Sequence, residues 1–546
     1  MYLTVSDFYT IPNNPGTAFI NCGQVIILAF FDPNYHLQWL TYYGASGTDQ
    51  QANAVVTRGS GANERVYIAG YTTGANLYPK VEAGAYNLQT VSTGYYRRAI
   101  LAKFDLQGNI LWGTYFGNGE SEIRGIDVDG TGRLHIVGQH NAVNVPLYPL
   151  AGATNLAFTG LTDLLVARFN TSDNINWSSV YGAGYGYSIR CTSDGGFIVS
   201  GRQGAGIPMP DQGGGAYHVG NAGGGDCTLL KFNSSAWFTH ATFYGGNHDW
   251  DFPAMNSLAL TPSGGVYLVG NTYSTSGFPL VGAPGTVDGL NTGKDGFIAY
   301  FTPALHLEWS TYVNATLDAV ATDANGNVFV SGTTLYNEAA TLPLMNAPGY
   351  YNQGGLEGSH DGVLLGFHGN HQQFYGSYFG GPEGSYPDEV TTMKWRNNRL
   401  YFGGFTTKQQ DVTSFFPLYN PGLPAYFDGT YQYVPGQLGL NQNYQDAFVS
   451  VICIGSGVGI DEVDDAHPNQ FTIGPDEGGQ RALFGLPDGH YAVALFDATG
   501  RIVATEAVTS TSGHARMDAR TAASGLYLVR VTSGEYLGTA RFINAQ

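Results

Sequence analysis

Short apolar runs separated by glycine-rich turns recur along about the first 450 residues. The recurring marker is an apolar run that ends in phenylalanine and is followed, eight residues later, by a tryptophan, histidine or tyrosine. A turn lies between the two members, so each marker predicts a strand, a hairpin and a second strand. The marker occurs at Phe31 and Trp39, Phe104 and Trp112, Phe169 and Trp177, Phe232 and His240, Phe301 and Trp309, and Phe367 and Tyr375.

A second hairpin follows each marker. In the clearest copy the run Gly125–Asp129 turns into Leu134–Gly138. We number the four strands of a unit as follows: the run ending in glycine is the first, the run ending in phenylalanine is the second, the third holds the marker aromatic, and runs such as Gly125–Asp129 are the fourth. The glycines that end the first strands after the opening one are 62 to 72 residues apart: Gly70, Gly138, Gly201, Gly270, Gly332 and Gly404. Four strands in about 66 residues predict a β-propeller, in which each blade is a four-stranded sheet.

The strand count sets the size of this propeller. First and second strands occur seven times and third and fourth strands six times, if residues 1–5 count as a first strand. The sequence therefore predicts an all-β, seven-bladed β-propeller over residues 1–454 whose seventh blade has only its first and second strands. We expect upstream sequence to supply the other two strands, and no secretory signal peptide is evident at Met1, which fits that expectation. The alternative is that a neighbouring subunit donates the strands, which would build a polymer.

The connections between first and second strands are long, at about 20 to 40 residues, and each carries an apolar residue followed by proline. Long loops on a rigid scaffold are a common place for a binding site. The recurrence of the pair also supports a structural interpretation, in which it docks each loop onto the next blade. The pairs are Ile11-Pro12, Tyr78-Pro79, Val145-Pro146, Ile207-Pro208, Phe278-Pro279, Leu342-Pro343 and Phe416-Pro417.

These units resemble the bacterial family of SBBP, or β-propeller repeat, proteins. The residues that carry the resemblance are Ala99–Phe104 with Trp112–Gly117, Asp295–Phe301 with Trp309–Tyr312, and Gly326–Val330. The resemblance covers residues 1 to about 454. Because this family is defined by its fold, the resemblance implies a propeller and says almost nothing about function.

The pattern changes near Gly455. Residues 455–465 are rich in glycine and acidic residues, which is typical of a flexible linker. From residue 466 onward, runs that alternate between apolar and polar residues, such as Tyr491–Asp497 and Gly525–Val531, predict strands. About 80 residues with this period-2 alternation predict a small β-sandwich over residues 466–546.

This C-terminal segment is similar to the sorting domain of proteins exported by type IX secretion in Bacteroidetes and their relatives. The resemblance rests on His467-Pro468-Asn469, Val493–Val503, Ser524–Val531 and Thr539–Ile543, although Gln470 stands where the family has proline. It implies a translocon and a shuttle as partners, and a location outside the cell or on the outer-membrane surface. It also implies cleavage of the domain or its exchange for a lipopolysaccharide anchor. The family motif falls on Asp497, Gly500, Arg501, Gly525, Tyr527, Arg530, Arg541 and Phe542.

Composition narrows the possible functions. The 78 glycines among 546 residues, with only 12% charged residues, suit many tight turns and not a helical bundle. The net charge of −19 argues against nucleic acid and anionic membrane surfaces as partners. No run of about 20 apolar residues predicts a membrane-spanning helix. The four cysteines leave both disulfides and free thiols open: Cys22, Cys191, Cys227 and Cys453.

No group of residues predicts a catalytic, cofactor or metal site. The segment Asp127–Gly132 resembles half of a calcium loop, but it lacks the glutamate at the twelfth position and its place in a hairpin is explained by turn chemistry. His368 and His371 could hold a metal ion, but they lie in a predicted hairpin with no carboxylate nearby in the sequence. The glycine runs 213–215 and 223–225 lack the Lys-Ser/Thr of a phosphate loop.

Two further features recur around the second and third strands. An aspartate lies six residues before the phenylalanine in several units, and such a ring of carboxylates could bind a cation in a channel. Recurrence favours instead a structural role, in which each aspartate accepts backbone hydrogen bonds at the start of a strand. In the fourth unit His240 replaces the tryptophan, without a recognisable Ser-His-Asp arrangement. The aspartates are Asp163, Asp226, Asp295, Asp361 and Asp446.

Three hypotheses for function follow. The leading one is a non-enzymatic propeller at the cell surface, which acts as a structural or adhesive component. The second is a glycan-binding or glycan-cleaving propeller that uses the aromatic loops, and cleavage would need paired carboxylates in the central channel. The third is a self-assembling filament subunit, completed by strands from a neighbour.

Overall fold

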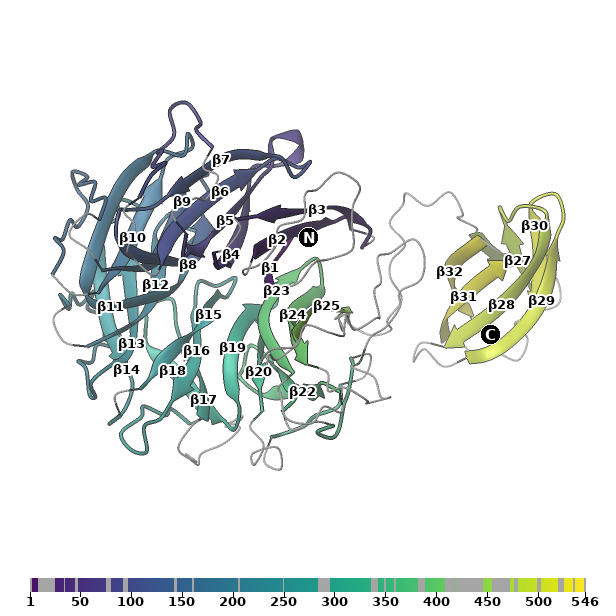
Figure 1. Cartoon of the computed structure of the whole chain (residues 1–546). Helices are drawn as coiled ribbons and strands as arrows, with labels where there is room; N and C mark the ends of the chain where they lie inside the picture. Colours follow the sequence, from purple (N-terminus) through teal and green to yellow (C-terminus); the bar gives the residue numbers. More distant parts are fainter. Residues whose placement is uncertain are drawn as a thin grey trace, which may run out of the picture. The chain divides into compact units, whose positions relative to one another are not determined.

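The chain divides into two compact units, one ending at Val451 and the other including Ile452–Gln546 (Figure 1). The computed structural model describes residues 2–7, 25–33, 35–44, 48–74, 80–91, 97–141, 145–159, 162–204, 207–248, 250–282, 295–334, 342–347, 350–357, 360–381, 388–407, 417, 445–453, 472–475, 480–497, 502–518, 525–533 and 536–544. Apart from one short 3-10 helix at Gly61–Asn63, the regular structure of these residues is all β. No helix in these ranges is long and apolar enough to cross a membrane.

The strands of the larger unit form sheets in which most neighbours are antiparallel. The first sheet is β1 (Tyr2–Asp7), β2 (Val25–Phe31) and β3 (Leu37–Tyr43), and the second is β4 (Gln50–Arg58), β5 (Arg65–Thr72), β6 (Arg98–Phe104) and β7 (Ile110–Tyr115). A seven-stranded sheet holds β8 (Glu120–Val128), β9 (Leu134–Asn141), β10 (Asp163–Phe169), β11 (Ile175–Cys191), β12 (Phe197–Gln203), β13 (Asp226–Phe232) and β14 (Phe238–Tyr244). An eight-stranded sheet holds β15 (Phe252–Leu260), β16 (Val266–Thr272), β17 (Asp295–Phe301), β18 (Leu307–Val313), β19 (Thr316–Thr322), β20 (Val328–Thr333), β21 (Gly362–Phe367) and β22 (Gln373–Phe379). The last sheet is β23 (Glu389–Arg396), β24 (Arg399–Thr407) and β25 (Gln445–Cys453).

The two large sheets are pairs of four-stranded sheets that are joined. Strand β11 is 17 residues long, and its first part pairs with β10 while its last part pairs with β12. Strand β11 therefore contains both the third and the fourth strand of one repeat, and no loop separates them. In the eight-stranded sheet the join is one parallel pair, Asn256 of β15 with Ala319 of β19.

The strands are grouped differently from the prediction. A fourth strand pairs with the first strand of the next unit, as β4 does with β5. The tight hairpin between these two strands makes them neighbours in one sheet, so the crossing between sheets falls between third and fourth strands. The prediction of six complete blades and one two-stranded blade is therefore wrong for the described residues. Among the described residues, the first sheet (β1–β3) holds a first, a second and a third strand but no fourth strand. The last sheet (β23–β25) holds a fourth, a first and a second strand but no third strand.

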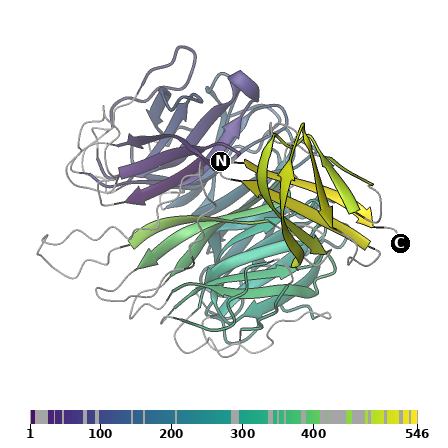
Figure 2. The ribbon, with the colours of Figure 1, turned by 90° about the vertical axis from the view of Figure 1, so that its right-hand side faces the viewer.

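The fourth-type strands lie side by side. Contacts run in succession from β4 to β8, β11, β15, β19 and β23. Figure 1 labels five of these strands toward the middle of the larger unit, whereas the label of the long strand β11 stands at its outer edge. Figure 2 shows the same sheets after a 90° turn. The side-chain amide of Asn53 in β4 donates a hydrogen bond to the carbonyl of Ile123 in β8 at 2.8 Å. We call these six strands the inner strands.

Both faces of a typical sheet are buried against its neighbours. In β6, Ile100 packs in a core with Leu28 of the preceding sheet, whereas Leu101 packs in a second core with Leu165 of the following sheet. Alternate residues of a strand point to opposite faces, which explains why the second strands are apolar at nearly every position. The marker tryptophan Trp112 is fully buried in the second of these cores, and Trp177 is fully buried in the core between the next pair of four-stranded sheets.

The spacing of eight residues in the marker comes from one hairpin geometry. Each of the six hairpins between second and third strands has a register shift next to the phenylalanine, as between Lys103 and Phe104. The fourth residue after the phenylalanine has a positive φ in every copy: Tyr35, Gly108, Asp173, Ala236, Leu305 and His371. Only one of these residues is glycine, so neighbouring contacts must hold the others in the left-handed region.

The glycine that ends each first strand is required by a bulge in the inner strand. A Cβ on Gly138 would lie 1.9 Å from the backbone oxygen of Glu122 in β8, so no other residue fits without moving the strands. The same clash, at 1.7 to 1.8 Å from an inner-strand carbonyl, exists at Gly70, Gly332 and Gly404. The extra residue of the bulge is inserted opposite this point, for example Arg124, which lies between the paired residues Ile123 and Gly125.

The long loops run along the outer edge of their own sheet. Lys80 and Gly113 of β7 exchange two backbone hydrogen bonds, and Met345 and Gly376 of β22 do the same. The carbonyl of Pro279 accepts hydrogen bonds from Ser310 Oγ and Tyr244 OH, both at 2.9 Å. Where the pairs are described, they do dock their loops, but the prediction that they dock onto the next blade is wrong. The apolar members are buried in cores that their own strands share with the preceding sheet, as Phe278 is between Tyr244 of β14 and Tyr312 of β18. The other buried members are Val145, Ile207 and Leu342. In these sheets the loops cover the edge strands, which limits pairing with other chains there.

The smaller unit has two sheets around one core. One holds β26 (Thr472–Pro475), β27 (Gln480–Phe484) and β30 (His514–Asp518), and the other holds β28 (Gly489–Asp497), β29 (Ile502–Ser510), β31 (Gly525–Ser533) and β32 (Tyr536–Asn544) in the order β29-β28-β31-β32. Leu483 and Met517 of the first sheet share a buried cluster with Val493 and Val529 of the second. This is the arrangement expected of a small β-sandwich. The predicted linker at 455–465 lies outside the described residues.

Candidate functional site

The four-stranded sheet of the smaller unit aligns three of the predicted motif residues. Tyr527 in β31 is paired with Asp497 in β28 on one side and with Phe542 in β32 on the other. The three residues therefore form one row across neighbouring strands. The Tyr527 side chain is buried in the core of this unit. This placement gives Tyr527 a structural role in the sandwich.

The remaining motif residues are distributed along the same sheet. Gly525 pairs with Asn544, and Arg541 pairs with Leu528. Arg530 is exposed, and its guanidinium carbon lies 5.2 Å from the centre of the Phe496 ring. Gly500 and Arg501 lie outside the described residues, as does the segment His467-Pro468-Asn469.

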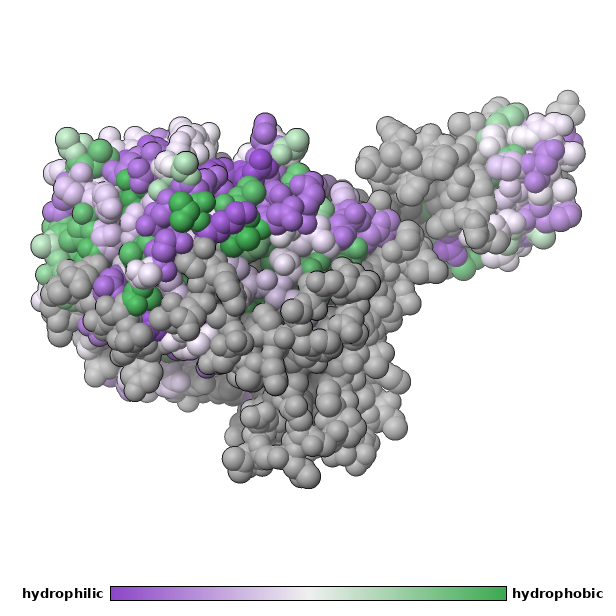
Figure 3. Space-filling view, turned by 45° about the horizontal axis from the view of Figure 1, so that its top comes forward, coloured by the Kyte–Doolittle hydropathy of each residue, from purple (hydrophilic) through white to green (hydrophobic). Residues whose placement is uncertain are grey.

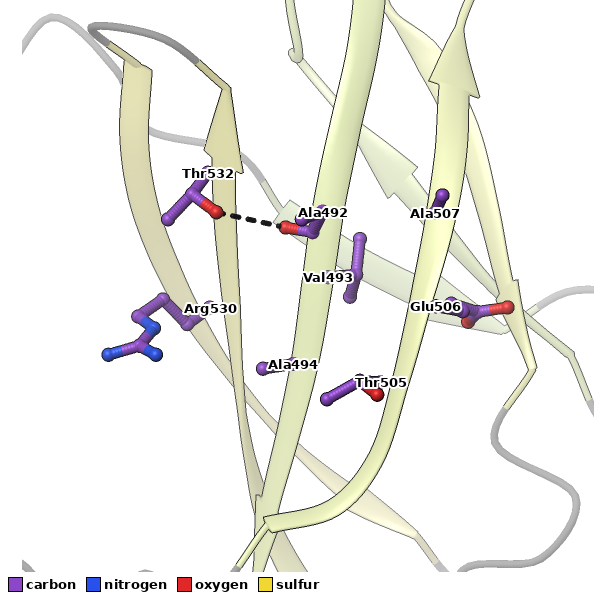
Figure 4. A pocket seen from close by; sticks show the side chains of 8 residues that line it. All are labelled: Ala492, Val493, Ala494, Thr505, Glu506, Ala507, Arg530 and Thr532. Carbon is purple, nitrogen blue, oxygen red and sulfur yellow. Dashed lines mark hydrogen bonds between the residues drawn. The ribbon is translucent and has the colours of Figure 1, made fainter.

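A shallow groove of about 450 Å³ lies beside Arg530 on this sheet (Figure 4). Its floor is formed by small side chains on β28 and β29, among them Ala492, Ala494 and Ala507. Thr532 Oγ1 donates a hydrogen bond to the carbonyl of Ala492 at 3.4 Å. In the sequence, this groove corresponds to small accessible residues that alternate with the buried residues Val493 and Leu495. The sequence analysis did not identify this alternation as a groove. The lining residues are Ala492, Val493, Ala494, Thr505, Glu506, Ala507, Arg530 and Thr532.

In the larger unit, the inner-strand bulges place residues of different chemistry at equivalent points. The guanidinium carbon of Arg124 lies 4.8 Å from the centre of the Tyr187 ring, and its Nη2 lies 3.3 Å from Glu122 Oε2. Arg97 Nη1 reaches the same carboxylate oxygen at 2.7 Å. Sequence reasoning missed this cluster because a bulge depends on strand register. The extra residues of the bulges are Asn53, Arg124, Tyr187 and Asp318.

The turn at Asp129 uses its carboxylate within the hairpin. Oδ1 accepts hydrogen bonds from the backbone N–H groups of Thr131 and Arg133, and Oδ2 accepts from Arg133 Nε and His135 Nε2. Burial alone would raise the pKa of Asp129, but the hydrogen bonds from His135, Thr131 and Arg133 outweigh it and hold the pKa well below its usual range. The turn interpretation of this segment is confirmed, because both carboxylate oxygens have protein donors.

The histidines of the 368–371 hairpin have separate surroundings. His371 is buried and stacks on Trp309, with ring centres 4.8 Å apart and planes at 3°, and its Nδ1 lies 3.2 Å from Tyr267 OH. His368 is exposed and stacks on Phe374. The two rings therefore serve different contacts and do not form a paired site.

Three of the five recurring aspartates accept a backbone hydrogen bond. Asp163, Asp226 and Asp361 each accept a hydrogen bond from the backbone N–H four residues earlier, at 2.7, 2.7 and 3.0 Å. The structural interpretation of these residues is confirmed. The side chain of Asp446 lies outside the described residues. Cys191 and Cys227 are free thiols.

Residues 483–544 match the family model of the secretion system C-terminal sorting domain. This segment spans the strands on which the motif residues lie. The sorting domain marks proteins that are exported to the cell surface or the extracellular space, so the protein is an exported one with the type IX secretion machinery as its partner.

Comparison with solved structures gives distant similarities. One is a protein of unknown function from Bacteroides caccae, with 10% identity, 56% of this chain and 78% of that chain covered, and a TM-score of 0.30. Another is a member of the DUF4221 family from Bacteroides vulgatus, with 9% identity, 65% and 93% covered, and a TM-score of 0.22. At such scores neither similarity supports an argument about the larger unit. No curated protein matches the chain.

Proposed function

We propose that the larger unit is a seven-bladed β-propeller that serves at the cell surface as a non-enzymatic structural or adhesive component. The sorting domain carries this proposal, because it places the larger unit outside the cell. The succession of inner strands supports the propeller, since each fourth-type strand contacts the next.

The use of polar side chains supports a non-enzymatic role. The repeated aspartates Asp129, Asp163 and Asp361 accept hydrogen bonds from their own hairpins and strand starts. Such carboxylates are held by the fold and are not aimed at a ligand. On the face shown in Figure 3, apolar residues of the described part are scattered among hydrophilic ones.

The test is made in a bacterium with type IX secretion. A protease added outside intact cells should degrade the full-length protein. A chain that lacks residues 483–544 should stay inside the cells and resist the protease. A strain that lacks the protein should adhere less to surfaces or to other cells, and the full chain should restore adhesion. Normal adhesion of that strain, or a hydrolytic activity of the purified chain on extracellular polymers, would overturn the proposal.

Glycan binding is a second candidate, which one exposed aromatic group favours. Trp250, in the connection between β14 and β15, is 55% exposed, and the guanidinium carbon of Arg202 lies 5.0 Å from the centre of its ring. The next residue, Asp251, is buried and accepts hydrogen bonds from Ser274 Oγ and Gly246 N, both at 2.7 Å. An exposed indole on an anchored backbone offers a flat apolar surface on which a sugar ring can stack.

The matched pair for this candidate is Trp250→Ala and Trp237→Ala. Trp237 is similarly exposed, at 52%, but lies in a tight hairpin between second and third strands. On a glycan array we expect binding by the parent chain and by Trp237→Ala, and loss of binding by Trp250→Ala. Equal binding by all three chains would exclude this site, and no binding by the parent chain would exclude the function.

A further inference from the structure

Three side chains of metal-ligand type converge in the fourth unit. Asp211 and His218 lie in the loop between β12 and β13, and His240 lies in β14. One possible ligand atom from each residue lies within 4.8 Å of the other two. Among the described residues, this is the one group of three His, Cys, Asp or Glu side chains that meets this condition. Sequence reasoning predicted no metal ligand here.

The hydrogen bonds of the two histidines fix which ring nitrogens carry protons. His240 Nε2 lies 2.9 Å from the carbonyl of Tyr217, and His218 Nδ1 lies 3.0 Å from the carbonyl of Ala241. A carbonyl can only accept, so these two nitrogens carry the protons and the opposite nitrogen of each neutral ring has a lone pair. A backbone carbonyl behind each ring is the usual outer-shell arrangement of metal-binding histidines.

The unprotonated nitrogen of His240 lies near the carboxylate of Asp211. Its Nδ1 is 3.7 Å from Asp211 Oδ1. The backbone N–H of Gln212 donates to the same Nδ1 at 3.3 Å, which agrees with an unprotonated nitrogen. At that length the bond is weak and can be exchanged for a metal ligand bond.

Equivalent positions in other units can be identified from repeated hydrogen bonds. The residue after the marker, such as Ala241 or Gly113, donates to a loop carbonyl, Pro210 or Lys80 respectively, which places Asp211 opposite Val81. A second repeated bond, from the third residue after the marker, places His218 opposite Asn87. The three positions hold Val81, Asn87 and Trp112 in the second unit, Pro149, Asn155 and Trp177 in the third, and Asn346, Asn352 and Tyr375 in the sixth.

The fold does not require this replacement. Trp112 Nε1 donates to the carbonyl of Tyr86 at 2.9 Å, which is the bond that His240 Nε2 makes to Tyr217. The imidazole thus keeps the donor of the indole and adds a nitrogen lone pair that the indole does not have. In the other three sets no position holds His, Asp, Glu or Cys, whereas in the fourth unit all three positions do. A purely structural histidine would not need the two other changes.

We propose that Asp211, His218 and His240 bind one divalent first-row transition-metal ion, for which Zn²⁺ is the best chemical match. Two imidazoles and one carboxylate are ligands that Zn²⁺ accepts, and nitrogen ligands disfavour Ca²⁺ and Mg²⁺. Asp211 and His218 are exposed, so the ion can enter from solvent and keep one position for water or another ligand. This proposal does not depend on the proposed function.

The ion would add one more link between this loop and β14, to which backbone bonds such as Ala241 N–H to the carbonyl of Pro210 already hold it. Gly213, Gly214 and Gly215 lie between the two loop ligands with φ of 77°, 69° and 81°. A Cβ on Gly213 or Gly214 would meet nothing within 4 Å, so this part of the loop is open. A metal that joins Asp211 and His218 to His240 in β14 cross-links the loop to the sheet, and the bound state is stabilised by the binding free energy.

The test uses the full chain without a histidine tag, stripped by a chelator and dialysed. Calorimetry with Zn²⁺ should show one equivalent bound, and Co²⁺ should give visible absorption bands that Zn²⁺ abolishes and Ca²⁺ does not. His218→Asn restores the residue of three other units at an exposed position and should weaken binding at least tenfold. His240→Trp restores the marker tryptophan and should remove the site.

The control variant is His368→Asn, which alters an exposed histidine outside the group and should bind like the parent. Metal-free His218→Asn should unfold at the same temperature as the metal-free parent, whereas added Zn²⁺ should raise the unfolding temperature of the parent only. Less than one equivalent of Zn²⁺ bound by the parent, or equal affinity in His218→Asn, would overturn the proposal whatever the fate of His240→Trp.

Discussion

The two units of the chain carry their information in opposite ways. In the larger unit some polar positions recur from repeat to repeat, and Asp163 and Asp361 accept backbone hydrogen bonds at the starts of strands. In the smaller unit nothing recurs, and a single motif that ends the chain identifies the export route. Repetition therefore reveals architecture, whereas positions that occur once, such as His240 and the inner-bulge residue Arg124, are where particular chemistry can reside.

The sharpest test of this rule compares two tryptophans. Trp177 is a marker residue with no exposed surface, whereas Trp237 occurs once and is 52% exposed. Trp177→Ala leaves a large cavity between two sheets and should lower the free energy of unfolding by about 3 to 5 kcal/mol. Trp237→Ala should change it by less than about 0.5 kcal/mol. Denaturant unfolding followed by fluorescence and circular dichroism measures both, and similar losses would contradict the rule.

Asp173 is a residue that could break the rule, because it occurs once and yet has structural contacts. It has a φ of 59°, and its carboxylate lies 2.8 Å from Arg58 Nη1 and 2.7 Å from Lys103 Nζ. Its side chain is only 2% exposed, so Asp173→Ala leaves a buried ammonium with Glu82 as its remaining carboxylate partner. We expect a loss of about 3 kcal/mol, the lower end for a broken buried pair.

The control for Asp173 is Asp105→Ala in the preceding hairpin. Asp105 accepts hydrogen bonds from the backbone N–H groups of Gln107 and Asn109 at the surface. Its loss should cost about 1 kcal/mol, as for a single turn-capping side chain. If Asp173→Ala and Asp105→Ala were equally stable, the buried ion pairs of Asp173 would contribute no more than a surface turn. Asp173 would then not be an exception to the rule that structural roles fall on repeated positions.

Two glycines separate a backbone requirement from simple turn preference. Gly138 ends a first strand and would place a Cβ 1.9 Å from the carbonyl of Glu122, whereas a Cβ on Gly130 would meet nothing within 4 Å. Gly138→Ala must push two strands apart and should cost about 1 to 3 kcal/mol. Gly130→Ala should be close to neutral. A neutral Gly138→Ala would show that the bulge is not rigid.

These residues also mark how far sequence reasoning could reach. The strands were predictable because alternation and the marker spacing of Phe104 and Trp112 depend on local geometry alone. The grouping of strands into sheets was predicted wrongly, although the tight hairpin between β4 and β5 is visible in the sequence and makes these two strands neighbours in one sheet. Arg124 was missed because its position depends on a register shift. Asp211 and His218 were missed because the loops differ in length, so their equivalents emerge only from hydrogen bonds.

Acid sensitivity is the smallest effect and tests whether the recurring turn carboxylates stabilise the fold. Hydrogen bonds hold the pKa of Asp129 below its usual range despite its burial. An unfolded aspartate titrates near 3.9, so the unfolded state binds more protons just below that pH, and the contribution of Asp129 is complete above about pH 4 to 5 and lost as the pH falls further. Burial lowers the pKa of His135, so protonation of the unfolded state below about pH 6.5 also reduces stability.

The test compares two variants. Asp129→Asn should flatten the fall of the unfolding free energy below pH 4, and His135→Phe should flatten the fall between pH 6.5 and 5. Denaturant titrations at several pH values measure both slopes. If Asp129→Asn left the pH dependence of the unfolding free energy unchanged, the carboxylate would specify the shape of the hairpin without stabilising the folded state. An unchanged pH dependence in His135→Phe would mean that burial of this histidine does not make the fold sensitive to acid.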